Sequence, residues 1–210
     1  FPEDGRSLGN DAVPELPEVE TIRASLDGVV VGRRVERVDL RTPRLRLPLD
    51  EKLRRAVTGR RIVATARRGK YLILELDDGL AWFFHMGMSG RLRFAENAAE
   101  APGLHDHLLA YFHGGGVLVF HDPRRFGLSV VEDAGTSKLL AGMGPEPLDR
   151  KAFDEAYFAS WRRRTRRTVK DVLMDQRVVA GLGNIYVNEI LFRAGVRPRV
   201  GGPKSTPPVR

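Results

Sequence analysis

A proline followed by a glutamate stands near the start of the chain, in the segment Pro14-Glu15-Leu16-Pro17-Glu18-Val19-Glu20. A proline with a free nitrogen is a secondary amine, which can attack an electrophilic carbon and form an iminium. A carboxylate beside it can move protons around that carbon. In this sequence thirteen residues precede Pro14, and an amide nitrogen has no nucleophilic lone pair. The chemistry that this pair indicates therefore requires Pro14 to be the first residue of the active chain.

Basic residues are concentrated in one short segment of the C-terminal half. The chain has 35 Lys and Arg against 27 Asp and Glu, a net charge of +8. Such a balance suits a polyanionic partner, although many basic proteins only gain solubility from it. Solvated helix faces usually alternate in sign, yet no acid stands between Glu155 and Asp171. The block therefore favours contact with phosphates, and its members are Arg162, Arg163, Arg164, Arg166, Arg167 and Lys170.

Composition excludes several classes of protein. A hydrophobic content of 42% and a charged content of 30% are typical of a folded globular chain. No run approaches about eighteen apolar residues and the first residues lack a signal-peptide pattern, so we expect no membrane span and a cytoplasmic location. The absence of cysteine excludes disulfides and cysteine-ligated metal sites.

Two helices and a series of short strands are predicted for the N-terminal half. Apolar residues recur at helical spacing from Pro17, and we expect Gly28 to end that helix. Residues 29–135 then show short apolar stretches between turn residues, with hairpin signals at Asp77-Asp78-Gly79 and Gly114-Gly115-Gly116. This density of short strands predicts an antiparallel sandwich. One further helix is expected over residues 49–57.

The C-terminal half is predicted to be helical. After Gly144-Pro145-Glu146-Pro147 the pattern changes, which indicates a domain boundary. Thr168 is expected to cap one helix, and Gly181-Leu182-Gly183-Asn184 to form a tight turn before another helix that ends at Gly195. Two helices around a glycine turn, flanked by arginines, are typical of a nucleic-acid-binding module. An earlier helix is expected to present one face made of Phe153, Tyr157 and Trp161.

Four segments in this order and spacing resemble the formamidopyrimidine-DNA glycosylase family, bacterial repair enzymes that excise oxidised purines such as 8-oxoguanine. They resemble its purine-lesion branch more than the related endonuclease VIII branch. The resemblance covers roughly residues 14–199. The segments are Pro14-Glu15-Leu16-Pro17-Glu18-Val19-Glu20, His85-Met86-Gly87-Met88-Ser89-Gly90, Asp122-Pro123-Arg124-Arg125-Phe126-Gly127 and Gly181-Leu182-Gly183-Asn184-Ile185-Tyr186.

The resemblance implies an α+β fold in two domains. An N-terminal helix would pack on an antiparallel β-sandwich of about eight strands, followed by a helical domain with a helix-two-turn-helix motif and a DNA cleft between them. We expect the catalytic β-sandwich domain over residues 14–143 and an incomplete DNA-binding helical domain over residues 148–199. Residues 1–13 are predicted to be a disordered leader, and residues 200–210 the end of an unstructured tail that begins near Arg197.

The resemblance also implies catalytic roles. Pro14 matches the nucleophile that attacks the sugar and forms a Schiff base, Glu15 the acid that protonates the opening sugar, and Lys70 a lysine over the lesion phosphate that moves protons during strand cleavage. Glu18 matches a second motif carboxylate, although a first-turn helix acid explains it equally well. A solvated lysine at a strand end remains the alternative for Lys70.

A glycosylase that extrudes a nucleotide must fill the gap left in the base stack. Met88, Arg124 and Phe126 match the family's void-filling residues, although Met88 and Phe126 taken alone would be read as packing residues. Positions that match or neighbour the family's DNA contacts are His105, Arg124, Arg125, Arg166, Lys170 and Asn184. Double-stranded DNA with oxidised bases or abasic sites is thus the expected partner of a monomeric protein.

Two departures from the family pattern bear on activity. Pro14 is not the first residue, and our hypothesis is that Val13 marks a GTG start codon, with proteolytic removal of the leader as the alternative. The family usually continues to a four-cysteine zinc finger, so we expect no zinc and no other cofactor here. A truncated or frameshifted reading frame and a divergent zincless member are both open explanations.

Two other functions remain open beside a bifunctional glycosylase and AP lyase. A catalytically silent DNA-binding paralogue would share the fold and the basic block. A glycosylase for oxidised pyrimidines would share the chemistry as well.

Overall fold

The N-terminal part of the molecule is a β-sandwich. The structure, a computed structural model, describes residues 13–97 and 102–201. Two four-stranded antiparallel sheets have the orders β1-β6-β7-β5 and β2-β3-β4-β8. Within the described residues these eight strands confirm the predicted sandwich. They are β1 Val35–Leu40, β2 Ile62–Arg68, β3 Tyr71–Leu76, β4 Leu80–His85, β5 Arg91–Ala95, β6 Asp106–Phe112, β7 Val117–His121 and β8 Leu128–Asp133.

Two helices close the open sides of the sandwich. Helix α1, Leu16–Val30, contacts β5 and β2, which are edge strands of the two sheets, and α2, Glu51–Val57, contacts the opposite edges β1 and β8. Edge strands left uncovered would offer unpaired backbone groups to other chains. Asp50 caps α2 by accepting a hydrogen bond from the Leu53 N–H. The helices therefore belong to the same core as the sheets.

The first helix is longer than predicted. Gly28 was expected to end it, but α1 continues to Val30 and the reversal occurs at Gly32, with a φ of +84°. Val30 is fully buried in the core between the sheets, so packing of this last turn outweighs the low helix propensity of Gly28. The expectation for Gly28 was wrong because a local stop signal competes with tertiary contacts.

Aromatic side chains fill the space between the sheets. Trp82 packs against Phe84 with ring centroids 4.8 Å apart, and Phe84 meets Phe120 edge-on at 5.6 Å. The indole N–H of Trp82 donates to the hydroxyl of Ser129, so the buried polar atom has a partner. The hairpin turns predicted at residues 77–79 and 114–116 connect β3 to β4 and β6 to β7.

The C-terminal part consists of three helices: α3 Glu155–Arg164, α4 Val169–Met174 and α5 Asn184–Arg193. Thr168 caps α4 as predicted, through a hydrogen bond from the Asp171 N–H. Phe153 does not share a face of α3 with Tyr157 and Trp161, because Asp154 caps that helix and Phe153 precedes it. Buried side chains of α4 and α5 form a separate small core.

The predicted unstructured tail begins too early. Residues 196–201 pack on the helical core: Val196 and Val200 contact it, and the Val200 carbonyl accepts a hydrogen bond from the Val169 N–H at 2.8 Å. The prolines and glycines in this segment indicate an irregular chain, and no sequence pattern shows that Val196 and Val200 pack on the helices. Most of the predicted leader (residues 1–12) and residues 202–210 lie outside the described part of the chain.

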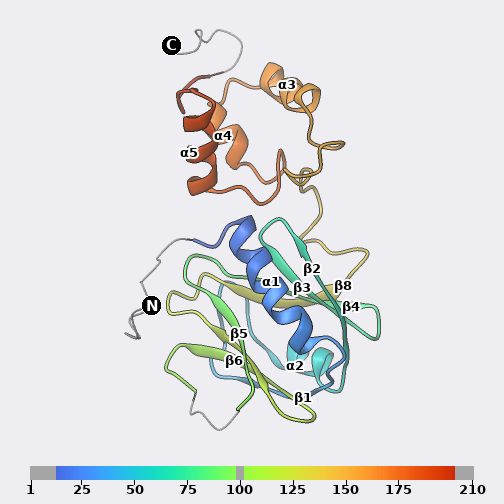
Figure 1. The fold of residues 1–210 in the computed structure, drawn as a ribbon. Helices are drawn as coiled ribbons and strands as arrows, with labels where there is room; N and C mark the ends of the chain where they lie inside the picture. Colours follow the sequence, from blue (N-terminus) through green and yellow to red (C-terminus); the bar gives the residue numbers. More distant parts are fainter. Residues whose placement is uncertain (1–12, 98–101, 202–210) are drawn as a thin grey trace, which may run out of the picture.

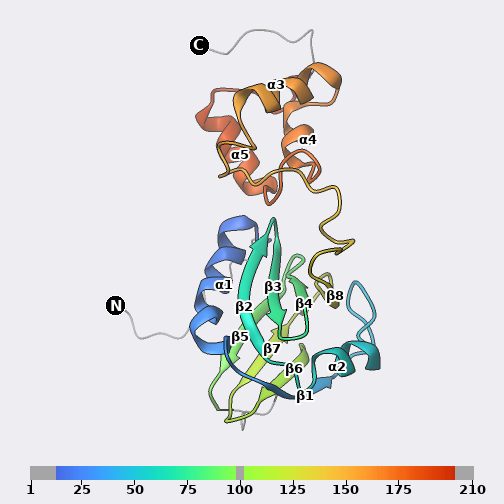
Figure 2. The same cartoon turned by 90° about the vertical axis from the view of Figure 1, so that its right-hand side faces the viewer.

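The two parts meet at the N-terminal end of α1. Figures 1 and 2 show that this end of α1 and the turn between β2 and β3 point toward α5 and the loop before it. The predicted boundary at residues 144–147 falls in the long segment between β8 and α3. Within the described residues no helix is long and apolar enough to cross a membrane.

Candidate active site and DNA interface

Strand pairing places the predicted site loops at one end of the sandwich. His85, the last residue of β4, pairs with Leu128, the first of β8, and Arg91 of β5 pairs with His121 of β7. Residues 86–90 and 122–127, which connect these strands, must therefore lie side by side. Tyr71 also pairs with His85, so the β2–β3 turn that carries Lys70 lies at the same end.

Glu15 connects the sandwich to the start of α5. The residue is 1% exposed, and its carboxylate accepts hydrogen bonds from the backbone N–H groups of Gly183 at 2.8 Å, Ile185 at 2.9 Å and Tyr186 at 3.2 Å. The first N–H groups of a helix lack partners within the helix, and Gly183 has no side chain to cap them. Glu15, 168 residues earlier in the chain, takes that place.

Gly183 leaves room for the two charged side chains. A Cβ atom at this position would lie 2.4 Å from Glu15 Oε1 and 2.6 Å from Lys70 Nζ. The same turn contacts the start of α1, since the Leu16 N–H donates to the Gly181 carbonyl at 3.1 Å. The glycines of the predicted turn are thus required by close approach.

Glu18 supports the same region. Its Oε2 accepts the backbone N–H of Glu15 at 3.0 Å, and its Oε1 accepts the hydroxyl of Tyr186 at 3.2 Å. Glu18 thus acts as a first-turn helix acid and also bridges to the helical part. The sequence left both interpretations of this carboxylate open, and these contacts are compatible with either.

Lys70 is half-buried beside these carboxylates. Burial lowers the pKa of Lys70 below its usual value, while the charges of Glu15 and Glu18 oppose that change. A pocket of about 390 Å³ opens beside Lys70. Its lining includes Val13 and Glu15, the two neighbours of Pro14 in the chain, together with Asn184 at the start of α5. Three predicted site segments therefore converge on one pocket.

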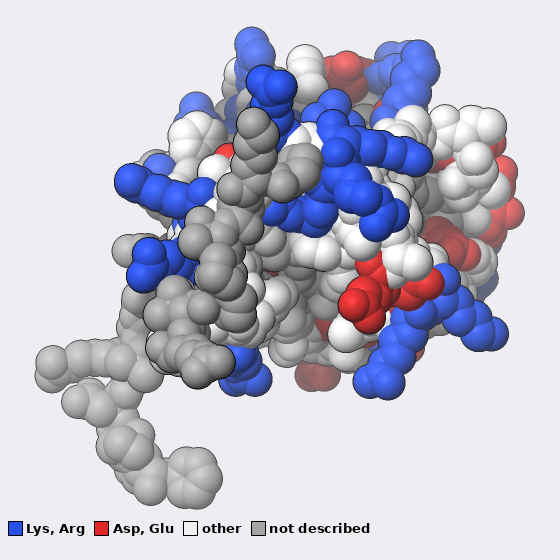
Figure 3. All heavy atoms as spheres, turned by 90° about the horizontal axis from the view of Figure 1, so that it is seen from above, with Lys and Arg blue, Asp and Glu red and all other residues white. Residues whose placement is uncertain are grey.

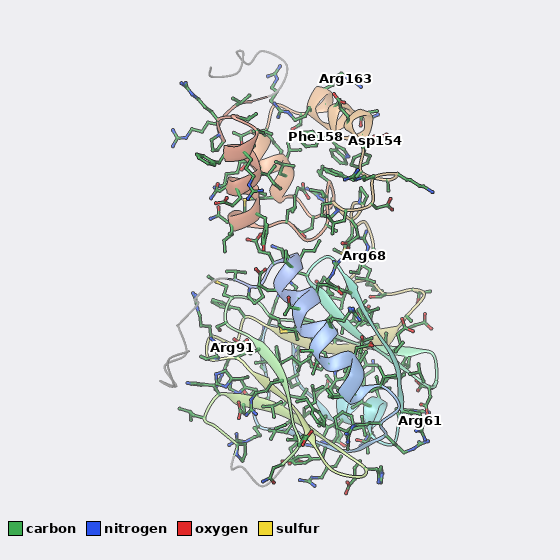
Figure 4. All side chains as sticks on the ribbon, viewed as in Figure 1. Arg61, Arg68, Arg91, Asp154, Phe158 and Arg163 are labelled. Atoms are coloured by element: carbon green, nitrogen blue, oxygen red, sulfur yellow. The ribbon has the colours of Figure 1, made fainter. Side chains whose placement is uncertain are left out.

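A cluster that the sequence did not reveal fixes the turn before Lys70. Glu146 Oε1 accepts the Gly69 N–H at 2.7 Å and the Arg68 guanidinium at 2.9 Å, and Arg67 lies 2.9 Å from Oε2. These hydrogen bonds and ion pairs lower the pKa of Glu146 against the raising effect of burial. We call Glu146, Arg67, Arg68 and Gly69 the Glu146 clamp. Figure 4 shows Arg68 at the edge of the sandwich that faces the helical part.

The predicted void-filling residues protrude from the loops at the sandwich end. Met88 is 38% exposed and Phe126 is 49% exposed, so both large apolar side chains reach solvent at this end of the sandwich. The guanidinium of Arg124 lies over the Phe126 ring, 5.2 Å from its centroid. We call Met88, Arg124 and Phe126 the wedge.

Asp122 joins the two loops behind the wedge. This fully buried carboxylate accepts the Ser89 hydroxyl at 2.6 Å and the Gly127 N–H at 2.7 Å. The Arg124 N–H in turn donates to the Ser89 oxygen at 3.2 Å. Ser89 and Asp122 were part of the recognised motifs but had no predicted role, because their partners lie 33 positions apart in the sequence.

His105 and Arg125 lie near the wedge rather than in the pocket beside Pro14. His105 is half-buried, and its backbone carbonyl accepts the Asp122 N–H at 2.9 Å. Arg125 is exposed and has a φ of +57°, which no other non-glycine residue in the described ranges approaches. Such a backbone conformation costs energy, and conformations of this kind cluster at functional sites.

The arginine block is only partly available for a ligand. Arg167 binds the Asp175 carboxylate at 2.7 Å, and Arg162 donates to the carbonyls of Arg167 and Gly201. These two side chains thus have partners within the protein, and phosphate contact by the block stays a prediction. Arg163, Arg164 and Arg166 are exposed, and Lys170 is half-buried. Figure 3, which looks down on the helical part, shows Lys and Arg side chains grouped on this face.

No metal centre is evident in residues 13–97 and 102–201. Within them, no three His, Asp or Glu side chains lie close enough together to hold an ion. The chain also contains no cysteine.

Known proteins resemble this chain in sequence and in fold. The family model of the formamidopyrimidine-DNA glycosylase N-terminal domain matches residues 13–129, and that of its H2TH domain matches residues 143–204. The formamidopyrimidine-DNA glycosylase of Geobacter metallireducens is 48% identical over 189 residues, which cover 89% of this chain and 69% of the relative. That of Cereibacter sphaeroides is 44% identical over 196 residues, with the same coverage.

Solved structures agree with these matches. Lactococcus lactis Fpg in complex with DNA containing an abasic site superimposes with a TM-score of 0.81 at 37% identity, over 88% of this chain and 69% of that one. Its complex with DNA containing Fapy-dG gives the same TM-score and identity, over 88% and 70%. Together, the matches over both parts of the molecule show that the chain belongs to the formamidopyrimidine-DNA glycosylase family.

Proposed function

We propose that this chain excises oxidised purines such as 8-oxoguanine and formamidopyrimidines from DNA and then cleaves the strand, with Pro14, Glu15 and Lys70 as the reacting groups. One observation carries the assignment of the residues. Glu15 and Lys70, from two separate segments of the sandwich part, meet the start of α5 beside the pocket that the neighbours of Pro14 line.

The reaction begins at the proline nitrogen. With that nitrogen free, its lone pair attacks C1′ of the damaged nucleotide, the bond to the base breaks, and the base leaves with a proton. Ring opening then gives the iminium, as the Glu15 carboxyl supplies a proton to the sugar oxygen. Three backbone donors fix the position of Glu15, so the acid is oriented before substrate arrives.

Strand cleavage requires a proton to leave C2′ of the iminium, after which the phosphate departs. Burial increases the neutral fraction of Lys70 by lowering its pKa, and the neutral amine can take part in proton transfer close to the phosphate. In its protonated form the same amine can stabilise the leaving phosphate. Lys70 thus suits both halves of the elimination.

The wedge and the basic residues would hold the DNA in position. Met88, Arg124 and Phe126 would fill the space that the extruded nucleotide leaves. Phosphate contacts are assigned to His105, Arg125, Arg166, Lys170 and Asn184. The solved relatives that superimpose on this chain are complexes with DNA containing abasic or Fapy-dG sites, which supports damaged duplex as the partner. A location at the bacterial nucleoid follows from this substrate.

Excision assays with matched duplexes test the function. A chain that begins at Pro14 should release 8-oxoguanine and nick the strand, and should act more slowly on thymine glycol. The chain that retains residues 1–13 serves as control, because its Pro14 nitrogen is acylated. Binding of both duplexes without any product from the Pro14-first chain would instead indicate the silent paralogue. Preference for thymine glycol would indicate the pyrimidine enzyme.

A further inference from the structure

The two loops that carry the wedge touch through their backbones, and one of them holds a strained non-glycine residue, Arg125. Gly87 has a φ of +61° and Arg125 a φ of +57°. A Cβ on Gly87 would lie 2.4 Å from the Phe126 carbonyl carbon, so the backbones of the two loops touch. Van der Waals contact alone does not fix how far Met88 and Phe126 project. A specific link between the loops is needed to hold them in register.

Ser89 and Asp122 provide that link. The Ser89 hydroxyl donates to the buried Asp122 carboxylate at 2.6 Å and accepts the Arg124 N–H at 3.2 Å. The second carboxylate oxygen accepts the Gly127 N–H at 2.7 Å, just after Phe126. Hydrogen bonds to a charged acceptor are short and strong. Met88 directly precedes Ser89, and the Arg124 N–H donates to the Ser89 oxygen. Phe126 directly precedes Gly127, whose N–H donates to Asp122.

The backbone of Asp122 is held by further hydrogen bonds. Its backbone carbonyl accepts hydrogen bonds from His107 Nε2 at 3.0 Å and from the Arg125 N–H at 3.2 Å, and its N–H donates to the His105 carbonyl at 2.9 Å. Asp122 thus connects the loops to the rigid start of β6. Neither Ser89 nor Asp122 is among the residues that line the pocket beside Pro14, where the reacting groups lie.

We propose that the Ser89–Asp122 pair positions the wedge: it holds residues 86–90 and 122–127 in one fixed arrangement. The pair thereby sets the rate at which the wedge opens the base stack. The proposal rests on the proposed function, since it assumes that Met88, Arg124 and Phe126 enter the stack. The pair acts before any bond breaks. Its loss should slow extrusion of the nucleotide and leave phosphate contacts intact.

Stopped-flow fluorescence of 2-aminopurine, placed beside 8-oxoguanine in a duplex, measures this opening without chemistry and uses the full 210-residue chain. Ser89→Ala should slow the rise in fluorescence about tenfold, the effect of losing one hydrogen bond to a charged group. Ser89→Thr, which keeps the hydroxyl, should restore it. Equilibrium affinity for undamaged duplex should change little, whereas the urea midpoint of Ser89→Ala should fall, because a buried oxygen of Asp122 loses its partner. Ser89→Thr should restore the midpoint as well.

Two further variants make the result decisive. Ser25→Ala removes a hydroxyl on α1 that bonds only the Ile22 carbonyl, and should behave as the parent chain. Phe126→Ala should slow opening directly, and Ser89→Ala added to it should have a smaller effect than in the parent chain, because only Met88 and Arg124 remain to be positioned. Normal opening by Ser89→Ala beside slow opening by Phe126→Ala would overturn the positioning role. Normal opening by Phe126→Ala would overturn it together with the wedge. Normal opening without base release by the Pro14-first chain would refute only the proposed chemistry.

Discussion

Gly183 has no side chain at the point where Glu15 and Lys70 meet the start of α5. Any larger residue would place a Cβ within 2.6 Å of both charged groups. Glu15 could then no longer accept the N–H groups at the start of the helix, and the acid of the proposed reaction would lose its orientation. The effect of this one position on catalysis should therefore exceed its effect on folding.

Gly183→Ala should lower the free energy of unfolding by about 1–3 kcal/mol, the usual cost of forcing atoms into a packed site. It should also reduce 8-oxoguanine excision more than tenfold, because Glu15 or Lys70 must move. Urea unfolding and single-turnover excision measure the two effects.

Gly28→Ala is the matched control for this substitution. Its Cβ meets nothing within 4 Å and lies inside α1, so stability should rise by about 0.5–1 kcal/mol with unchanged excision. Full excision activity in Gly183→Ala would show that the close approach of Glu15 and Lys70 to this position is not needed.

The motif residues of the site could be proposed from the sequence, but the groups that hold them could not. Pro14, Glu15, Lys70 and Asn184 belong to recognisable segments, and the structure brings their surroundings to one pocket. Glu146 and Asp122 bond to residues 77 and 33 positions away. Such partners are brought together by the tertiary fold, which no local pattern specifies. The roles of the motif residues stay predictions.

At the scale of elements, the β2–β3 hairpin and the segment between β8 and α3 are held together by the Glu146 clamp. The hairpin presents Lys70 directly after Gly69, whose N–H the clamp binds. Arg67 extends the cluster to Glu20 of α1 at 3.1 Å. The clamp therefore links three elements that surround the active site.

Glu146→Gln should lower the free energy of unfolding at pH 7 by about 1–2 kcal/mol, the lower part of the range for charged hydrogen bonds because the side chain is partly exposed. Its folded-state pKa lies below the usual 4.5. The stabilisation is thus present above pH 4.5 and is lost as pH falls through the lower, folded-state pKa. Thermal unfolding across this pH range measures it.

Glu51→Gln is the control, because the Glu51–Arg54 pair of α2 is about half exposed and should contribute under about 1 kcal/mol. If both variants show the same stability at every pH, the clamp has no special role. A variant that unfolds normally but cleaves strands slowly would place the role of Glu146 in positioning Lys70.

Element types were predictable where local signals agreed with packing. The turns after β3 and β6 and the cap of α4 follow glycine, aspartate and threonine in their usual positions. Three expectations failed, two of them because packing decided and the one for Phe153 because Asp154 caps the helix. Gly28 lies within α1, Phe153 lies outside α3, and Val200 packs on the helical core.

At the scale of the whole molecule, net charge overstates the surface available for DNA. The chain carries +8, but Arg167 is bound to Asp175 and Arg162 to backbone carbonyls. Arg166 and Arg125 are exposed, on the helical part and on the sandwich respectively. A duplex that spans both parts would contact phosphates from both.

Affinity for duplex DNA should fall steeply with salt. If about five or six phosphates are neutralised, log affinity against log salt should have a slope of roughly −5. Arg166→Ala should make the slope shallower by about one, whereas Arg167→Ala should leave it nearly unchanged and lower stability instead. Fluorescence anisotropy titrations at several salt concentrations measure the slopes. Equal changes from both substitutions would contradict the separation between free and internally bound arginines.

In the proposed reaction, the nitrogen of Pro14 forms the covalent intermediate. A free α-amino group has a pKa of about 8, so about a tenth is unprotonated at pH 7, which suffices for attack. The direct measurement is borohydride trapping of a Pro14-first chain on an abasic duplex, followed by tandem mass spectrometry of the adduct. We expect one adduct, on the nitrogen of Pro14, and none with the chain that retains residues 1–13. An adduct on Lys70, or tight binding with no adduct at all, would contradict it.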